Sequence, residues 1–179
     1  MLTRVLVCGA MGVARLLELR FSSGNLRAAP DARESGLSRV NFVLIAALNV
    51  AVVAGTLIFG DRCVRRPWLA LLLSVQPLRY WVIAMLGGRW NVRGAVSPGL
   101  EVATGGPYAY VRHPNYGVLV VELASLPAAF GLGRFAVLAT IANIVLLAVR
   151  VREEEALLFD VPGYREHFQD KRRFIPGVF

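Results

Sequence analysis

The chain has 179 residues, 56% of them hydrophobic, and a formal net charge of +8. This length favours a single domain, over residues 1–179, and the hydrophobic share exceeds the roughly 45–50% of soluble domains. Charged residues cluster in 15–39, 61–66, 89–112 and 150–173, with long uncharged stretches between them. The arginines flank hydrophobic stretches and form no basic stripe with aromatics, so the pattern indicates a membrane protein and argues against a nucleic-acid partner.

Five apolar segments follow one another along the chain. They predict an all-α integral membrane protein with about five transmembrane helices, near residues 3–19, 41–59, 67–86, 116–130 and 134–149. The first is marginal in length and carries Arg15 and Glu18, which can pair on one helix face. The last two are short for a full span of roughly 20 residues, so we expect a helical hairpin joined by residues 131–133. A cytoplasmic tail over 150–179 follows, with a further short helix.

Basic residues are unevenly distributed between the connecting segments. Most of them lie in the loops over 20–39 and 89–112 and in the tail. The positive-inside rule therefore predicts a cytoplasmic location for these parts and an N-terminus outside. Lys171 is the single lysine among the 20 basic residues, which is typical of GC-rich bacterial coding and favours a bacterial inner membrane. Cys8 and Cys63 lie in or beside apolar stretches without metal-binding spacing, and we expect both to be buried free thiols. A disulfide is the alternative if both lie near the outer face.

The most informative motif is the polar string between Gly106 and Tyr116. Because proline disfavours helical backbone in the preceding residue, we expect His113 to be extended and Pro114 to begin the next helix. Unpaired N–H groups at that helix start attract negative charge, and Arg112 and His113 add donors beside it. The string predicts a site for a ligand with one anionic end. An interfacial anchor that contacts lipid phosphates is the alternative.

A second polar string, from Arg150 to Glu155, closes the last apolar segment. In a helix, Arg150 and Glu154 lie one turn apart on the same face. Three adjacent glutamates are usually a solvated face, which is our expectation for Glu153. One carboxylate turned inward could instead hold a ribose diol or an ammonium group.

Two ionisable residues lie inside apolar segments: Arg79 in the third and Glu122 in the fourth. Such groups usually face the protein interior or a cavity. They could pair with each other as structural residues or line a substrate cavity, and the sequence leaves both alternatives open.

These motifs together carry a family resemblance. The pattern is Gly106-x-Tyr108, Arg112-His113-Pro114-x-Tyr116, then Glu154-Glu155-x-x-Leu158, and a tyrosine-containing tail ending near Pro176. It resembles the isoprenylcysteine carboxyl methyltransferase and phospholipid methyltransferase superfamily of membrane enzymes over about residues 76–176. Arg15 to Glu18, Ser22 to Asn25 and the third apolar segment resemble a bacterial subgroup similar to alkylpyrone O-methyltransferases.

The resemblance implies binding of S-adenosylmethionine in a cytoplasmic pocket beside a tunnel for a lipid-like substrate. The implied cofactor-binding residues are Val102, Ala103, Tyr108, His113, Pro114, Asn115, Tyr116 and Glu154. Arg150 and Arg112 would be catalytic, and Arg150, Arg79 and Glu122 would face the substrate. No metal is implied. The tail departs from the family at Phe168, where many relatives have a second tyrosine.

Methyl transfer from a sulfonium needs mainly alignment and a dry site. An acidic acceptor, a carboxyl or enol hydroxyl, is already ionised near neutral pH, so Arg150 can orient it and His113 is expected to be a cofactor-binding donor. The alternatives are phospholipid N-methylation, a sterol-type reductase with a nicotinamide cofactor, and a non-enzymatic membrane anchor.

Overall fold

The computed structural model describes residues 1–99 and 101–175, so the predicted Pro176 and the end of the tail lie outside the described residues. The described residues are helical, with no strands and only two isolated bridges, at Arg33–Val96 and Val111–Arg172. The predicted all-α fold is therefore confirmed. The elements are α1 (Leu2–Ala28), α2 (Ser38–Phe59), α3 (Arg66–Ser74), α4 (Gln76–Leu86), η1 (Gly87–Arg89), η2 (Gly106–Ala109), α5 (Pro114–Ala129), α6 (Gly133–Leu158) and α7 (Tyr164–Phe168).

The first helix is longer than predicted. α1 has 27 residues and continues nine residues beyond the predicted end at Leu19, to Ala28. Pro30 disfavours helical backbone in Ala29, whose φ and ψ are −119° and 76°, so the helix ends there. The positions of the charged residues did not predict where α1 ends, because contacts with a distant loop stabilise its additional turns.

The third predicted helix is interrupted. α3 ends at Ser74 and α4 begins at Gln76, with Val75 between them. Pro77 lacks an N–H group, and its ring crowds the carbonyl one turn earlier, which accounts for the break. At the other end of α4, Gly87 has φ of 52°, a conformation that suits glycine, and closes the helix.

The last long helix also extends beyond its predicted end at Val149. α6 runs to Leu158, so Arg150 to Glu155 belong to this helix and not to the tail. The stretch between Gly133 and Pro162 contains no proline or glycine, and its Ala, Leu, Glu and Arg residues are good helix formers. The polar string is therefore carried on a rigid element.

Within residues 1–99 and 101–175, three helical segments are long and apolar enough to cross a membrane: Ser38–Phe59, Arg66–Arg89 and Gly133–Leu158. α5 has only 16 residues and α1 carries several charges, so neither meets that criterion. The protein is an integral membrane protein, whereas the count of five spans remains a prediction.

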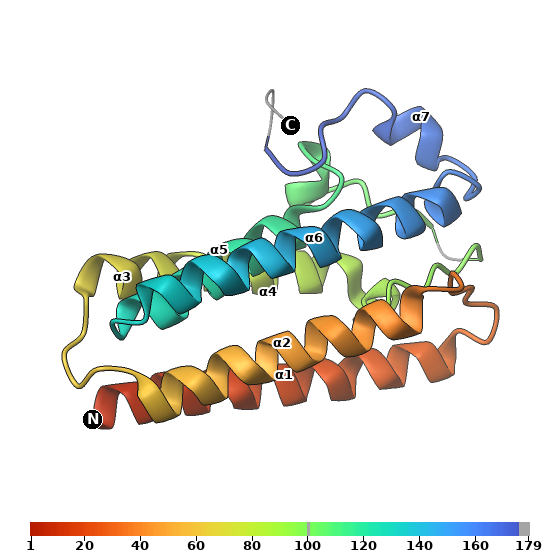
Figure 1. The fold of residues 1–179 in the computed structure, drawn as a ribbon. Coiled ribbons are helices and arrows are strands. Elements are labelled where there is room, and N and C mark those ends of the chain that lie inside the picture. The colour runs from red at the N-terminus through yellow and green to blue at the C-terminus, as the bar shows by residue number, and fades with distance from the viewer. Residues whose placement is uncertain (100, 176–179) are drawn as a thin grey trace.

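Figure 1 shows how the helices place the connecting segments. α1 and α2 lie side by side as an antiparallel pair, and α5 packs against α2, α3, α4 and α6. The loop after α1, the loop after η1 and the tail lie at one end of the molecule. Backbone hydrogen bonds join the first two at Arg33–Val96, and others join the tail to residues 112 and 113. The side of the membrane that this end faces remains a prediction.

Candidate active site

A cavity of about 580 Å³ lies between the α1–α2 pair and the rest of the molecule. Its apolar part is lined by α1 and α2 residues, among them Leu16, Leu19, Phe42, Ile45, Val53 and Leu57. Its polar part is formed by the loop after η1, the start of α5 and the last turns of α6. The cavity can therefore accommodate a ligand with a long apolar part and a polar head.

The first polar string enters this cavity at the start of α5. His113 is the residue before the helix, with φ of −129° and ψ of 60°, and Pro114 begins α5. This non-helical backbone directs the His113 ring toward the second polar string, where Nε2 lies 3.2 Å from Glu155 Oε1. The ring also stacks on Tyr116, with 5.3 Å between ring centroids.

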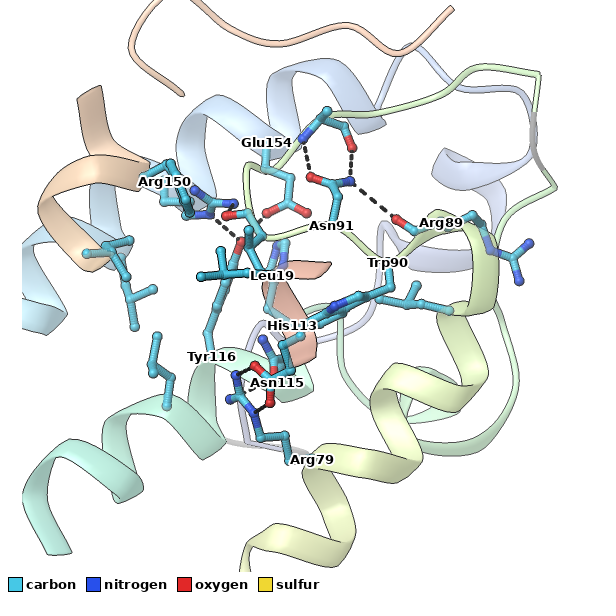
Figure 2. A pocket seen from close by; sticks show the side chains of 18 of the residues that line it. Leu19, Arg79, Arg89, Trp90, Asn91, His113, Asn115, Tyr116, Arg150 and Glu154 are labelled. Carbon is cyan, nitrogen blue, oxygen red and sulfur yellow. Dashed lines mark hydrogen bonds and ion pairs between the residues drawn. The ribbon is translucent and has the colours of Figure 1, made fainter. Parts of the chain in front are cut away.

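The two polar strings meet at this point, through residues that are 38 and 42 positions apart in the sequence. The Tyr116 hydroxyl donates a hydrogen bond to Glu154, which faces the cavity. Glu155 is the carboxylate that turns fully inward, with 6% of its surface exposed, whereas Glu153 and Glu154 are half-buried. Figure 2 shows Glu154 and Arg150 both pointing toward the Tyr116 hydroxyl.

Glu155 holds the tail against the site. It pairs with Arg173 at 2.6 Å and with Arg112 Nη1 at 3.3 Å, and the hydrogen bond from Arg173 to this carboxylate raises the pKa of Arg173. Arg112 also donates to the carbonyls of Lys171 at 2.9 Å and Gln169 at 2.8 Å. These contacts give Arg112 a structural role in holding the tail, while its expected catalytic role remains a prediction.

Arg150 is buried at the junction of the polar and apolar parts. Its Nε donates to the Tyr116 hydroxyl at 3.0 Å and its Nη2 donates to the Val92 carbonyl at 2.6 Å. Arginine has five N–H groups, so within the described residues three have no hydrogen-bond partner. A planar cation with free donors suits a carboxylate or another oxyanion.

The loop over 89–96 is part of the site that the sequence did not reveal. The Asn91 side chain accepts from the N–H groups of Arg93 and Ala95 and donates to the Ala95 carbonyl at 2.7 Å, which closes a compact turn (Figure 2). Asn91 followed by Gly94 is a turn signal that could have identified this loop. The sequence could not predict that this loop forms part of the cavity wall, because this position depends on contacts with α1 and α6.

Arg79 and Glu122 belong to one buried cluster of charges. Arg79 pairs with Glu18 at 2.6 Å and with Glu122 at 3.3 Å, and Arg15 pairs with Glu18 at 2.7 Å and with Glu122 at 3.0 Å. This pairing agrees with the structural alternative. Arg79 also lines the cavity and its Nη1 lies 3.3 Å from Asn115 Oδ1, so a substrate-facing role for it remains a prediction.

The structure brings most of the predicted site residues to one cavity. The lining includes Arg79, Val102, Ala103, Tyr108, Arg112, His113, Asn115, Tyr116, Arg150 and Glu154, and does not include Pro114 or Glu122. Burial raises the pKa of Tyr108, which therefore stays a neutral hydroxyl at physiological pH. The ligand-binding roles of all these residues remain predictions.

Cys8 is a buried free thiol as expected, but Cys63 is exposed because it lies in the polar turn between α2 and α3 rather than within a helix. Over residues 1–99 and 101–175, no group of three His, Cys, Asp or Glu side chains could hold a metal ion.

The family of the chain follows from comparison with known proteins. The model of the isoprenylcysteine carboxyl methyltransferase (ICMT) family matches residues 68–160, just over half of the chain. The chain therefore belongs to this methyltransferase family, and the match contains the loop over 89–96 and both polar strings.

Within known sequences, the chain is similar to the uncharacterized protein YpbQ of Bacillus subtilis (strain 168). The two are 42% identical over 89 residues. The aligned stretch covers 50% of this chain and 53% of YpbQ, so the chain spans about half the length of this curated relative.

Proposed function

We propose that the protein is an integral membrane methyltransferase that uses S-adenosylmethionine to O-methylate a carboxyl or acidic hydroxyl of a lipid-like substrate, of the isoprenylcysteine or alkylpyrone type. The observation that carries this proposal is the position of Arg150. A buried cation with free N–H donors lies where a polar chamber opens into an apolar channel.

Unpaired polar atoms in the polar chamber support binding of the cofactor. Three buried polar atoms on its wall have no hydrogen-bond partner among the described residues: Arg89 Nε, Trp90 Nε1 and the Tyr164 hydroxyl. Each such atom costs about 1–3 kcal/mol when it remains unpaired, so a polar ligand that reaches it is favoured. Burial raises the pKa of Tyr164 as well, so this hydroxyl is neutral and can donate.

Separate groups in the chamber match separate parts of S-adenosylmethionine. The Asn115 side-chain amide would donate to its carboxylate, the His113 ring, held by Glu155, would contact the cofactor, and Glu154 would accept hydrogen bonds from the ribose hydroxyls or the amino group. The backbone of Val102 and Ala103 would lie along the remaining part of S-adenosylmethionine. When bound, the cofactor supplies an electrophilic methyl group on a positively charged sulfur.

The residues of the chain supply alignment and a dry environment for the acceptor. Arg150 would orient the ionised oxygen of the acceptor through its free N–H groups, and the apolar side chains of α1 and α2 would exclude water from the reaction. No general base is needed, because a carboxyl or acidic enol is ionised near neutral pH. An amine acceptor would instead place a basic group beside Arg150, so this cation favours O-methylation over phospholipid N-methylation.

The class of enzyme is tested by ligand binding to the detergent-purified protein. Titration calorimetry is carried out with S-adenosylhomocysteine and, separately, with reduced nicotinamide dinucleotide phosphate. We expect saturable binding of the first and none of the second. Binding of the nicotinamide dinucleotide alone would indicate a sterol-type reductase, and binding of neither would leave a non-enzymatic membrane protein.

A further inference from the structure

Ser22 and Asn25, near the end of α1, lie outside the cavity lining but contact the loop that forms its wall. Ser22 has 1% of its surface exposed, and its hydroxyl accepts a hydrogen bond from the Val92 N–H at 3.0 Å. The Asn25 side chain donates to the carbonyls of Gly87 at 2.9 Å and Trp90 at 2.8 Å. Two side chains of α1 therefore hold one short stretch of distant backbone.

The same stretch of backbone holds Arg150. Both backbone polar groups of Val92 form hydrogen bonds. Its N–H donates to the Ser22 hydroxyl, and its carbonyl accepts from Arg150 Nη2 at 2.6 Å. Gly94 follows with φ of 71°, and a Cβ at this position would lie 2.9 Å from Arg150 Nη2. The loop therefore closely encloses the guanidinium group.

The other contacts of Arg150 fix only one side of its guanidinium group. Nε is held by Tyr116, whereas Nη2 depends on the position of the Val92 carbonyl. Residues 87–94 form a 3-10 turn and bends, and their internal hydrogen bonds, from the Trp90 N–H and through the Asn91 side chain, do not involve the Val92 peptide groups. Within the described residues, the Val92 N–H is held by Ser22 of α1, and the Ser38 hydroxyl of α2 holds the following Arg93 carbonyl, so α1 supplies the direct anchor of the Val92 peptide.

We propose that Ser22 and Asn25 are positioning residues that hold the Val92 carbonyl in place and thereby orient Arg150 toward the methyl acceptor. This inference rests on the proposed function for the identity of the acceptor, but the link from α1 to Arg150 is a property of the fold. Because an error of about 1 Å in a reacting group can cost roughly 100-fold in rate, loss of either anchor is expected to lower kcat by about 10- to 100-fold.

The variants are Ser22→Ala, which removes the hydroxyl acceptor, and Asn25→Asp, which replaces the donating amide by an oxygen of the same size. Ser23→Ala is the matched control, because Ser23 is exposed and its hydroxyl bonds within α1 to Leu19. Methyl transfer is measured with radiolabelled S-adenosylmethionine and two acceptors, an S-farnesylated N-acetylcysteine and a long-chain 4-hydroxy-2-pyrone. Affinity for S-adenosylhomocysteine and the melting temperature are measured in parallel.

A further readout does not depend on turnover. Phenylglyoxal modifies accessible guanidinium groups, and mass spectrometry of the peptide that contains Arg150 gives the rate at this residue. We expect Ser22→Ala and Asn25→Asp to accelerate modification of Arg150 at least threefold and to lower kcat, with cofactor affinity within twofold of the parent protein. Ser23→Ala should match the parent in every measurement.

The inference is overturned if both variants match Ser23→Ala in kcat and in modification of Arg150. It is also overturned if cofactor affinity and activity fall together while Arg150 reacts at the parental rate. If the parent protein methylates neither acceptor, the proposed substrate class fails. The modification rate of Arg150 then decides the inference: faster modification in Ser22→Ala and Asn25→Asp supports it, and the parental rate in both variants overturns it.

Discussion

At the scale of single residues, Arg150 is the group on which the proposed chemistry depends most. Its charge is buried, and its contacts with Tyr116 and Val92 fix the plane of the guanidinium group without using all of its donors. Lysine would keep the charge but could not make these two bonds and still present a planar pair of donors to an oxyanion.

Substitution of Arg150 tests this role directly. We expect Arg150→Lys and Arg150→Ala to lower kcat roughly 10- to 100-fold, which corresponds to the loss of a charge-assisted hydrogen bond of about 1.5–3 kcal/mol. The dissociation constant for S-adenosylhomocysteine should change less than threefold. Arg152→Ala is the control, because Arg152 is exposed on the same helix. Normal methylation by Arg150→Ala would show that another group orients the acceptor.

Gly94 offers a second test at the same site. Alanine there would bring a methyl group to 2.9 Å from Arg150 Nη2, at a backbone φ of 71° that alanine rarely adopts. We therefore expect Gly94→Ala to lower kcat by at least tenfold. Gly88→Ala, which meets open space, should retain the parental rate in the same radiolabel assay. Equal rates for the two variants would contradict the close packing of this loop on Arg150.

At the scale of the helices, the buried charge cluster joins α1, α4 and α5. Arg15, Glu18, Arg79 and Glu122 form a neutral set of two arginines and two glutamates, and Gln76 adds a hydrogen bond to Glu122 at 2.9 Å. Breaking a buried pair by removing one partner is costly, because it leaves an uncompensated charge.

We expect Glu122→Ala to reduce the free energy of unfolding by about 3–5 kcal/mol. Thermal unfolding of the detergent-solubilised protein, followed by circular dichroism, measures the effect as a lower melting temperature. Asp61→Ala is the comparison: it removes an exposed pair with Arg65 at 3.7 Å and should cost about 0–1 kcal/mol. A melting temperature for Glu122→Ala equal to that of Asp61→Ala would argue against the cluster as a structural link.

The comparison of prediction and structure is also clearest for the helices. Apolar patterning located α2 well, because its boundaries coincide with changes in hydrophobicity. It failed where tertiary contacts extend a helix, as Ser22 and Asn25 do for α1, and where helix-forming polar residues continue one, as in α6. The two polar strings were recognisable from their residue types, whereas the loop over 89–96 acts through backbone groups that sequence does not display.

At the scale of the whole molecule, the predicted orientation places the loop between α2 and α3 outside the cell. This loop contains the exposed Cys63, and the other cysteine, Cys8, is buried. A membrane-impermeant maleimide should therefore label Cys63 in intact cells and leave Cys63→Ser unlabelled. Ser97→Cys, introduced into Cys63→Ser, should react only after the cells are permeabilised. The reverse pattern would invert the orientation and place the polar chamber outside.

The central claim is that two distant polar strings form one site for S-adenosylmethionine. The most direct measurement is calorimetric titration of S-adenosylhomocysteine into four variants of the detergent-purified protein. His113→Ala and Glu154→Ala remove one cavity residue from each string, while His167→Ala and Glu166→Ala remove the same residue types from exposed positions on α7. We predict that the first two weaken binding about 10- to 100-fold and the last two by less than twofold. Parental affinity in the folded His113→Ala and Glu154→Ala variants would contradict the account.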